Sequence, residues 1–167
     1  MSELSFIRAV QASLSSVSLS WLAMVCARYL IFIFPAFALV LSKGGKRVAA
    51  EAALAAALAF GITVFIGTLI ARVRPFRASS KVMLLIDEPL TRFSLPSGHA
   101  AVAFALAAAI AYANPKWGLP AFAVASLVAF GRVAAGVHYP TDAVAGALLG
   151  MAVWFLLHTL LHQLKFV

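Results

Sequence analysis

The chain has 167 residues, of which 64% are hydrophobic and 11% are charged. A soluble domain is roughly half apolar and a quarter charged, so the composition argues against a water-soluble protein and favours one that faces lipid. The net charge of +8 lies in short basic clusters between apolar runs, which suits anionic headgroups or phosphate groups better than nucleic acid, and the single cysteine, Cys26, excludes an intrachain disulfide.

The elements that the sequence predicts are all helices. Leu4, Ile7, Val10 and Leu14 recur at helical spacing and predict an N-terminal amphipathic helix lying in the membrane interface. Apolar stretches that approach the roughly 20 residues of a spanning helix then run over residues 21–41, 49–71, 99–113, 119–136 and 141–161. No repeat, low-complexity tract or long linker divides the chain. We therefore predict one all-α membrane domain over residues 1–167, with about five transmembrane helices.

Five spans place alternate connections on opposite membrane faces. One face would carry "SKGGKR" at 42–47, "NPKWG" and Lys165, and the other the long connection 72–99 and the turn "GRVAAGVHYPTD". The short cluster of Lys43, Lys46 and Arg47 favours the cytoplasm for the first face under the positive-inside rule. Because the second face also holds many basic residues, charge alone leaves the orientation open.

Unusual polar residues gather on this second face, and polar groups at membrane depth tend to mark function. His99 ends the sequence "PSGH" and opens a predicted helix. The backbone N–H groups of Ser97, Gly98 and His99 are therefore expected to be free to bind an anion. Arg74 and Arg132 can each donate paired hydrogen bonds to phosphate. The structural alternatives are a capping role for Ser97 or His99 and simple snorkelling of the arginines.

His138 and Asp142 are four residues apart, which places both on one face of a helical turn. Asp142 could then hold one imidazole nitrogen and leave the other free to attack phosphorus. Pro140 fits the first turn of the last helix, so Asp142 is expected in that turn. The alternative is an ordinary turn that caps the helix.

The ordered set "RP", "PSGH" and "GRxxxxxHxxxD", which covers residues 74–142, resembles the type-2 phosphatidic acid phosphatase superfamily of membrane lipid phosphatases. This resemblance implies that His138 is a nucleophile that forms a phosphohistidine, that Asp142 orients it, and that His99 is the general acid and base. It also implies that the phosphoryl oxygens are bound by Arg74, Ser97, Gly98 and Arg132. It implies no metal and no cofactor in the reaction.

Two positions depart from the family pattern. The family lysine seven residues before Arg-Pro is Gly67, and the family serine before Arg132 is Gly131. The missing positive charge could come from the long connection, where Arg77, Lys81 and Arg92 are candidates. Arg28, which interrupts the first apolar stretch, could pair helices or stand at the mouth of the site.

Within the superfamily the chain most resembles bacterial undecaprenyl-diphosphate phosphatases of the bacitracin-resistance type. This implies hydrolysis of undecaprenyl diphosphate to undecaprenyl phosphate and phosphate, in a bacterial inner membrane, with the active site facing the periplasm. Phosphatidylglycerophosphate phosphatase and lipid A 1-phosphatase activities stay open, as does a non-catalytic lipid transporter or channel. The expected partners are a polyprenyl or phospholipid phosphate or diphosphate and membrane lipids, without nucleic acid; the oligomeric state stays open.

Two further patterns fall on the last predicted helix. His158 and His162 are four residues apart, as in a metal-binding pair, but the neighbouring sequence offers no third ligand, so we expect them to anchor the helix at the interface. Gly146 and Gly150 form a GxxxG pattern, which predicts close packing inside the bundle, with dimerisation as the alternative.

Overall fold

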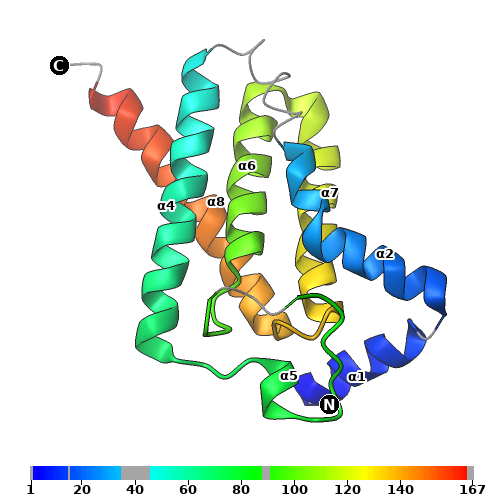
Figure 1. Ribbon diagram of the computed structural model, residues 1–167. Coiled ribbons are helices and arrows are strands. Elements are labelled where there is room, and N and C mark those ends of the chain that lie inside the picture. The colour runs from blue at the N-terminus through cyan, green and yellow to red at the C-terminus, as the bar shows by residue number, and fades with distance from the viewer. Residues whose placement is uncertain (1, 15, 35–45, 88–90, 165–167) are drawn as a thin grey trace.

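A computed structural model describes residues 2–14, 16–34, 46–87 and 91–164, and every regular element in these ranges is a helix (Figure 1). The elements in chain order are α1 (Glu3–Ser13), α2 (Val17–Arg28), the short 3-10 helix η1 (Leu30–Phe32), α4 (Lys46–Ile70), α5 (Pro75–Ala78), α6 (Gly98–Ala113), α7 (Pro115–Ala134) and α8 (Pro140–Gln163).

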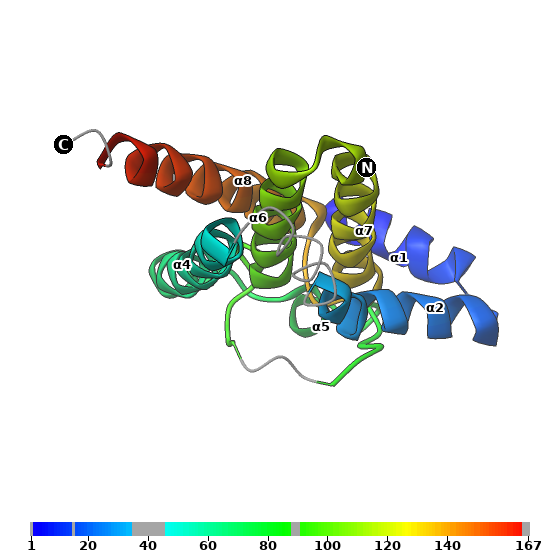
Figure 2. The same cartoon turned by 90° about the horizontal axis from the view of Figure 1, so that it is seen from above.

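Helix α6 is the centre of the bundle and has α4, α7 and α8 around it (Figures 1 and 2). It is apolar on all sides, as expected of a helix that other helices surround. Alanine dominates its buried positions, and six of its alanines are fully buried: Ala100, Ala101, Ala103, Ala105, Ala107 and Ala109. Small side chains let the neighbouring backbones approach closely.

Close packing is tightest where α8 crosses α6. A Cβ atom at Gly146 would overlap the carbonyl oxygen of Ser97, and one at Gly150 would overlap that of Ala101. The GxxxG pattern therefore brings α8 against α6, and the predicted packing inside the bundle is confirmed. The same contact brings the start of α8 beside the start of α6, where the candidate site lies.

Most predicted helix boundaries are confirmed to within a few residues. Pro115 and Pro140 lie in the first turns of α7 and α8, as proline's missing N–H and fixed φ favour. The first predicted span differs, because α2 ends at Arg28 and a 3-10 turn follows. The remainder of that span, residues 35–41, and Lys43 of the predicted basic cluster lie outside the described residues.

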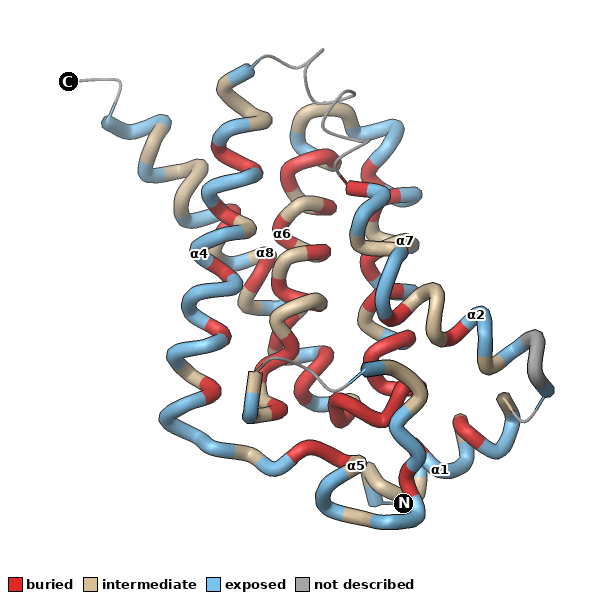
Figure 3. Tube along the Cα trace, viewed as in Figure 1, coloured by how far each residue is buried: buried red, intermediate tan, exposed pale blue. Residues whose placement is uncertain are grey.

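Several helices are candidates for crossing a membrane. By length and composition, long apolar spans lie within Lys46–Ala78, Pro115–Ala134 and Pro140–Gln163, and shorter apolar helices lie at Leu19–Arg28 and Gly98–Ala113. Many positions along α4 and α8 are exposed (Figure 3). They include large apolar residues such as Leu69 and Leu156, which suits contact with lipid. The protein is thus a helical membrane protein, and the number of five spans stays a prediction.

Helix α1 is present as expected, and the face that carries Ile7 and Gln11 packs on protein, while its place in the membrane interface stays a prediction. Ile7 is fully buried against Val82, Val133 and Tyr139. Gln11, one turn further on the same face, donates hydrogen bonds to the Met83 carbonyl at 2.8 Å and the Ala134 carbonyl at 3.1 Å. The helical period identified the apolar stripe correctly, and the surface that covers it became visible only in the fold.

Candidate active site

A cavity of about 620 Å³ opens where the ends of α4, α6 and α7 meet the 72–97 connection. The sequence-predicted residues in its wall are Arg74, Gly98, His99, Arg132 and His138. Much of the remaining wall is apolar and includes Phe60, Val64 and Phe93. The fold therefore gathers residues from 74 to 138 around one space that has a basic, histidine-containing end and an apolar side.

The turn between α7 and α8 places His138 at this cavity. Gly136 has φ +77°, and a Cβ atom there would overlap the carbonyl oxygen of Met83. Glycine is required for both reasons, since L side chains disfavour this backbone region and no space exists for one. Phe76 N–H donates to the Gly136 carbonyl at 3.2 Å and holds the turn on α5.

The hydrogen bonds of His138 define its tautomer. Its Nδ1 lies 2.7 Å from the carbonyl oxygen of Ser94, which can only accept, so Nδ1 carries the proton. Nε2 then carries the lone pair and lies 3.4 Å from Nη1 of Arg74. A phosphoryl group attracted by Arg74 would therefore meet an unprotonated ring nitrogen.

Burial lowers the pKa of His138 to about 4, and the charges of Arg74 and Arg132 add to the effect while Asp142 opposes it. The ordinary value is near 6.5. The imidazole is therefore neutral at physiological pH, which is the protonation state that a nucleophilic nitrogen needs.

Asp142 is fully buried and acts on His138 mainly through a third residue. Its Oδ2 lies 3.7 Å from His138 Nδ1 and accepts hydrogen bonds from the Ser94 hydroxyl and, at 2.8 Å, from Tyr139 N–H. Its Oδ1 pairs with Arg72 at 2.6 Å. The expected direct hydrogen bond is thus replaced by a longer contact, because Ser94 takes the position next to the ring.

Arg72 joins this site to the first helix. Its guanidinium pairs with Glu3 of α1 at 2.5 Å as well as with Asp142, and it lies over the ring of Tyr139 with 3.9 Å between Cζ and the ring centroid. Glu3 also accepts hydrogen bonds from Thr141 N–H at 3.1 Å and from the Thr141 hydroxyl at 2.8 Å. Sequence reasoning missed Ser94, Arg72 and Glu3, and nothing in their local sequence separates them from other polar residues.

The two predicted phosphate-binding arginines differ in how the protein holds them. Arg74 is buried and donates to the Thr91 carbonyl and hydroxyl and, at 2.8 Å, to the Val137 carbonyl. Arg132 donates from Nη1 to the Ala27 carbonyl at 3.1 Å, while its buried Nε has no hydrogen-bond partner among the described residues. A buried charged donor without a partner is costly. This unpaired donor and the place of Arg132 in the cavity wall are consistent with the predicted phosphate-binding role, which stays a prediction.

The start of α6 supplies fewer free N–H groups than the sequence suggested. Ser97 N–H donates to the Asp142 carbonyl at 3.0 Å, and the Ser97 hydroxyl caps the helix by accepting from Ala100 N–H at 3.5 Å. The N–H groups of Gly98 and His99 have no backbone or side-chain acceptor in the described part of the chain, as is usual for the first turn of a helix. Two of the three predicted donors thus remain available to an anion.

The two departures from the family pattern have different structural contexts. A Cβ atom at Gly131 would lie 2.6 Å from the Ala27 backbone nitrogen, so the close crossing of α2 and α7 excludes the family serine. A Cβ atom at Gly67 would meet ordinary contacts, the closest being 3.4 Å from the Leu95 carbonyl oxygen, so the missing lysine is not excluded by space.

Other cations reach the cavity in place of that lysine. Arg28 of α2 and Arg92 of the long connection line it, and Arg28 pairs with Asp87, which also lines it. Arg77 and Lys81, the other candidates from the sequence, are not among the lining residues. The structure therefore places Arg28 at the mouth of the site, one of the two alternatives that the sequence left open.

The sequence pattern of the PAP2 superfamily matches residues 48–166 of this chain. The chain belongs to the PAP2 superfamily. Two curated relatives are an undecaprenyl-diphosphatase of Sulfolobus acidocaldarius and the putative undecaprenyl-diphosphatase YbjG of Escherichia coli. The first is 36% identical over 104 residues, which are 59% of this chain and 50% of the relative. The second is 31% identical over 135 residues, which are 78% of this chain and 67% of the relative.

The fold agrees with this membership. The crystal structure of LpxE from Aquifex aeolicus superimposes with a TM-score of 0.75 at 25% identity, over 93% of this chain and 94% of that one. Against the curated relatives the match is shorter, since it spans half of the Sulfolobus acidocaldarius protein and two thirds of YbjG.

Proposed function

We propose that this PAP2 protein hydrolyses undecaprenyl diphosphate to undecaprenyl phosphate and phosphate through a phosphohistidine at His138. The observation that carries the proposal is the neutral ring of His138 at a cavity that Arg132 also lines. A neutral imidazole has its lone pair on Nε2, at a cavity where the buried Nε of Arg132 lacks a partner. The names of the two curated relatives support the choice of substrate.

The first step forms a bond between His138 Nε2 and the terminal phosphorus and breaks the bond to the bridging oxygen. His99, at the start of α6, gives its proton to the departing lipid phosphate. The guanidinium of Arg132 and the N–H groups of Gly98 and His99 stabilise the charge that develops on the phosphoryl oxygens. The other ring proton stays bonded to Nδ1 and hydrogen-bonded to the Ser94 carbonyl, and Asp142 stabilises the positive ring.

The second step is the hydrolysis of this intermediate. His99, now neutral, takes a proton from a water molecule, and the hydroxide oxygen attacks phosphorus. The N–P bond breaks, its electron pair returns to Nε2, and orthophosphate leaves. Both histidines are then in their starting protonation states.

The apolar side of the cavity supports a lipid substrate. Phe60 and Val64 on α4 and Phe93 on the long connection line it beside the basic end. A phosphate placed among Arg74, Arg132 and His138 would leave the attached chain against these side chains. This arrangement suits an isoprenoid or an acyl lipid phosphate, and the relatives favour the isoprenoid.

The test is phosphate release by the purified protein in detergent from undecaprenyl diphosphate, phosphatidylglycerophosphate and phosphorylated lipid A. We expect the highest kcat/KM with undecaprenyl diphosphate, and a protein-bound phosphate that is labile to acid and stable to alkali, as phosphohistidine is. His138→Ala should lose nearly all turnover and the bound label while extracting normally. Retention of more than about a tenth of wild-type turnover by this variant would contradict the covalent mechanism.

A further inference from the structure

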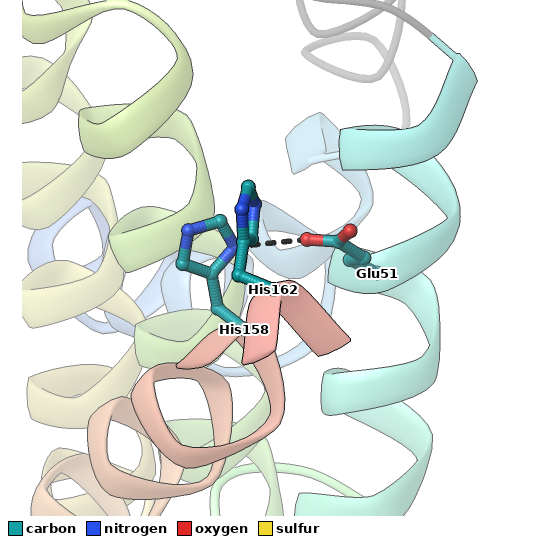
Figure 4. Close-up of side chains that lie close together, drawn as sticks. All are labelled: Glu51, His158 and His162. Carbon is teal, nitrogen blue, oxygen red and sulfur yellow. Dashed lines mark hydrogen bonds and ion pairs between the residues drawn. The ribbon is translucent and has the colours of Figure 1, made fainter. Parts of the chain in front are cut away.

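A second cluster of ionisable side chains lies far from the cavity. Glu51 near the start of α4 faces His158 and His162 in the last turns of α8 (Figure 4). One ligand-type atom from each residue lies within 4.8 Å of the others. The cavity lies beside the start of α6 and the turn that leads into α8. These starts are at the opposite end of the bundle from the end of α8 (Figure 1). The third ligand that the sequence around the histidine pair lacked is therefore supplied by another helix, 107 residues away.

We propose that Glu51, His158 and His162 bind a divalent transition-metal ion of the zinc class, which joins the end of α8 to α4. The donor set is two imidazoles and one carboxylate, which suits zinc better than the oxygen-preferring calcium or magnesium. Histidines four residues apart present both rings on one helical face, as metal-binding helices do.

The geometry is close to that of a metal site. Nδ1 of His158 lies 2.9 Å from Oε2 of Glu51. Two ligands of one tetrahedral zinc ion are about 3.3 Å apart, given bonds of about 2.0–2.1 Å. The rings of His158 and His162 have centroids 4.2 Å apart. The remaining approach needs a side-chain movement of His162, which is exposed and free to make it.

Packing holds His158 in place. Its ring stacks on Trp154, with centroids 5.0 Å apart and 10° between the planes, and lies 4.2 Å from the ring of Tyr112. A ligand whose ring is fixed before the ion arrives loses little conformational entropy on binding. His158 and Glu51 thus form a rigid half of the site, and His162 is its adjustable part.

Two neighbouring side chains, Arg47 and His158, hold the Glu51 carboxylate. Oε1 of the buried Glu51 carboxylate accepts a hydrogen bond from Nε of Arg47 at 2.6 Å, and Oε2 faces His158. Arg47 also donates to the Leu161 carbonyl at 3.2 Å. An ion would take Oε2 and leave Oε1 with Arg47, whose positive charge opposes the ion. Arg47 is therefore expected to lower the affinity for the metal ion. Removal of Arg47 should raise this affinity, whereas removal of a ligand should lower it.

The experiment uses the full chain in detergent, carrying an affinity tag without histidine and stripped with EDTA that is then removed. Zn²⁺ is titrated by calorimetry, and Co²⁺ by its ligand-field absorption. We expect one ion per chain and a higher unfolding temperature with Zn²⁺. His162→Ala and Glu51→Gln each remove a direct ligand and should weaken binding by at least about tenfold, the lower limit for loss of an outer-shell partner.

Two matched variants sharpen the test. Arg47→Gln should tighten binding, because it removes the competing charge. His99→Ala removes a histidine from the other end of the bundle and should leave Zn²⁺ affinity unchanged. Phosphate release should be the same before and after EDTA treatment, since the cluster lies outside the cavity.

Three results would overturn the proposal. They are absence of binding at saturating Zn²⁺, unchanged affinity in His162→Ala, and weaker binding in Arg47→Gln. Since His162 is exposed, its variant is expected to fold even if Glu51→Gln does not, and it decides the question alone.

Discussion

Nδ1 of His138 lies 2.7 Å from the carbonyl oxygen of Ser94, whereas the nearer carboxylate oxygen of Asp142 is 3.7 Å away. The Ser94 hydroxyl in turn donates to Asp142. Ser94 therefore connects the two residues, and its backbone fixes the imidazole tautomer while its side chain engages the carboxylate. Asp142 therefore interacts with the His138 ring electrostatically over 3.7 Å, and it accepts hydrogen bonds from Ser94 and Tyr139, which flank the ring.

The Ser94 side chain is expected to matter less than the Asp142 carboxylate. Ser94→Ala removes the hydroxyl and keeps the carbonyl, so kcat should fall only a few-fold. Asp142→Asn removes the charge and should reduce kcat by about ten- to a hundredfold, the cost of losing a hydrogen-bonded charge. Phosphate release from undecaprenyl diphosphate measures both, and the double variant should lose less than the product of the two effects. A larger loss in Ser94→Ala than in Asp142→Asn would contradict the arrangement.

The role of His99 predicts a dependence on the leaving group. A glycerol oxygen departs poorly without a proton, whereas a lipid phosphate departs more readily. His99→Ala should therefore lose about a hundred- to ten-thousandfold on a phosphomonoester lipid, and less on undecaprenyl diphosphate. Equal losses on both substrates would mean that His99 is not the acid, while His138→Ala should abolish both activities alike.

The lowered pKa of His138 predicts how stability depends on pH. The folded value is about 4 and the unfolded value near 6.5, so the unfolded chain binds the proton more readily. This contribution to stability is complete above pH 6.5, and is lost as the pH falls from 6.5 to 4. Thermal unfolding in detergent between pH 4 and 8 should show the loss, and His138→Gln should show a shallower slope. An equal slope in the variant would place the titrating group elsewhere.

Activity should also respond to pH on two sides. His138 must be neutral and His99 protonated, so the rate is expected to be bell-shaped, with limbs that belong to the coupled site. Because burial depresses the pKa of His138, the pH range in which His138 is neutral should extend below the pH of an ordinary histidine. An acid limb centred at or above pH 6.5 would contradict a pre-neutral nucleophile.

Cations at the cavity mouth should compensate for the glycine at position 67. Arg28→Ala and Arg92→Ala are expected to raise KM several-fold, and Gly67→Lys in the Arg28→Ala background should lower it again. Arg77→Ala is the matched control, since Arg77 does not line the cavity. The measurement is the KM of each variant for undecaprenyl diphosphate. An increase in KM for Arg77→Ala as large as that for Arg28→Ala would show that general surface charge is responsible.

The proposed periplasmic site has a direct topological test. Ser80 lies exposed in the connection beside the cavity. In a Cys26→Ser background, Ser80→Cys should react with an impermeant thiol reagent added to intact cells. Labelling only after lysis would reverse the orientation, and Lys116→Cys, in the first turn of α7 at the opposite end of the bundle, is the matched control.

Short-range patterns predicted much of this architecture. The boundaries of α6 and α8 follow from apolar runs and from helix-starting residues such as Ser97 and Pro140, which act within one turn. The three sequence motifs, several of whose residues line the cavity, were identified for the same reason, because each motif is local and all three fall at helix ends.

Features that depend on distant pairs could not be predicted. Ser94, Arg72 and Glu51 look like ordinary polar residues until the fold brings Asp142 or His158 beside them, 48, 70 and 107 residues away. The covering of α1 by protein has the same origin. Helical periodicity shows that a stripe is apolar, and it does not show whether lipid or protein will cover it.

The contact between Glu3 and Thr141 spans 138 residues, so Glu3 can support Arg72, the partner of Asp142, only when α1 and α8 have met. Contacts of such separation form late, because the intervening chain must first be ordered. During biosynthesis the nascent protein is therefore expected to have no phosphatase activity until α8 is inserted into the membrane. Phosphate release would then measure the fraction of protein whose helices have assembled completely. Fusions that hold α1 away from the bundle should give protein that is inserted correctly but has low activity.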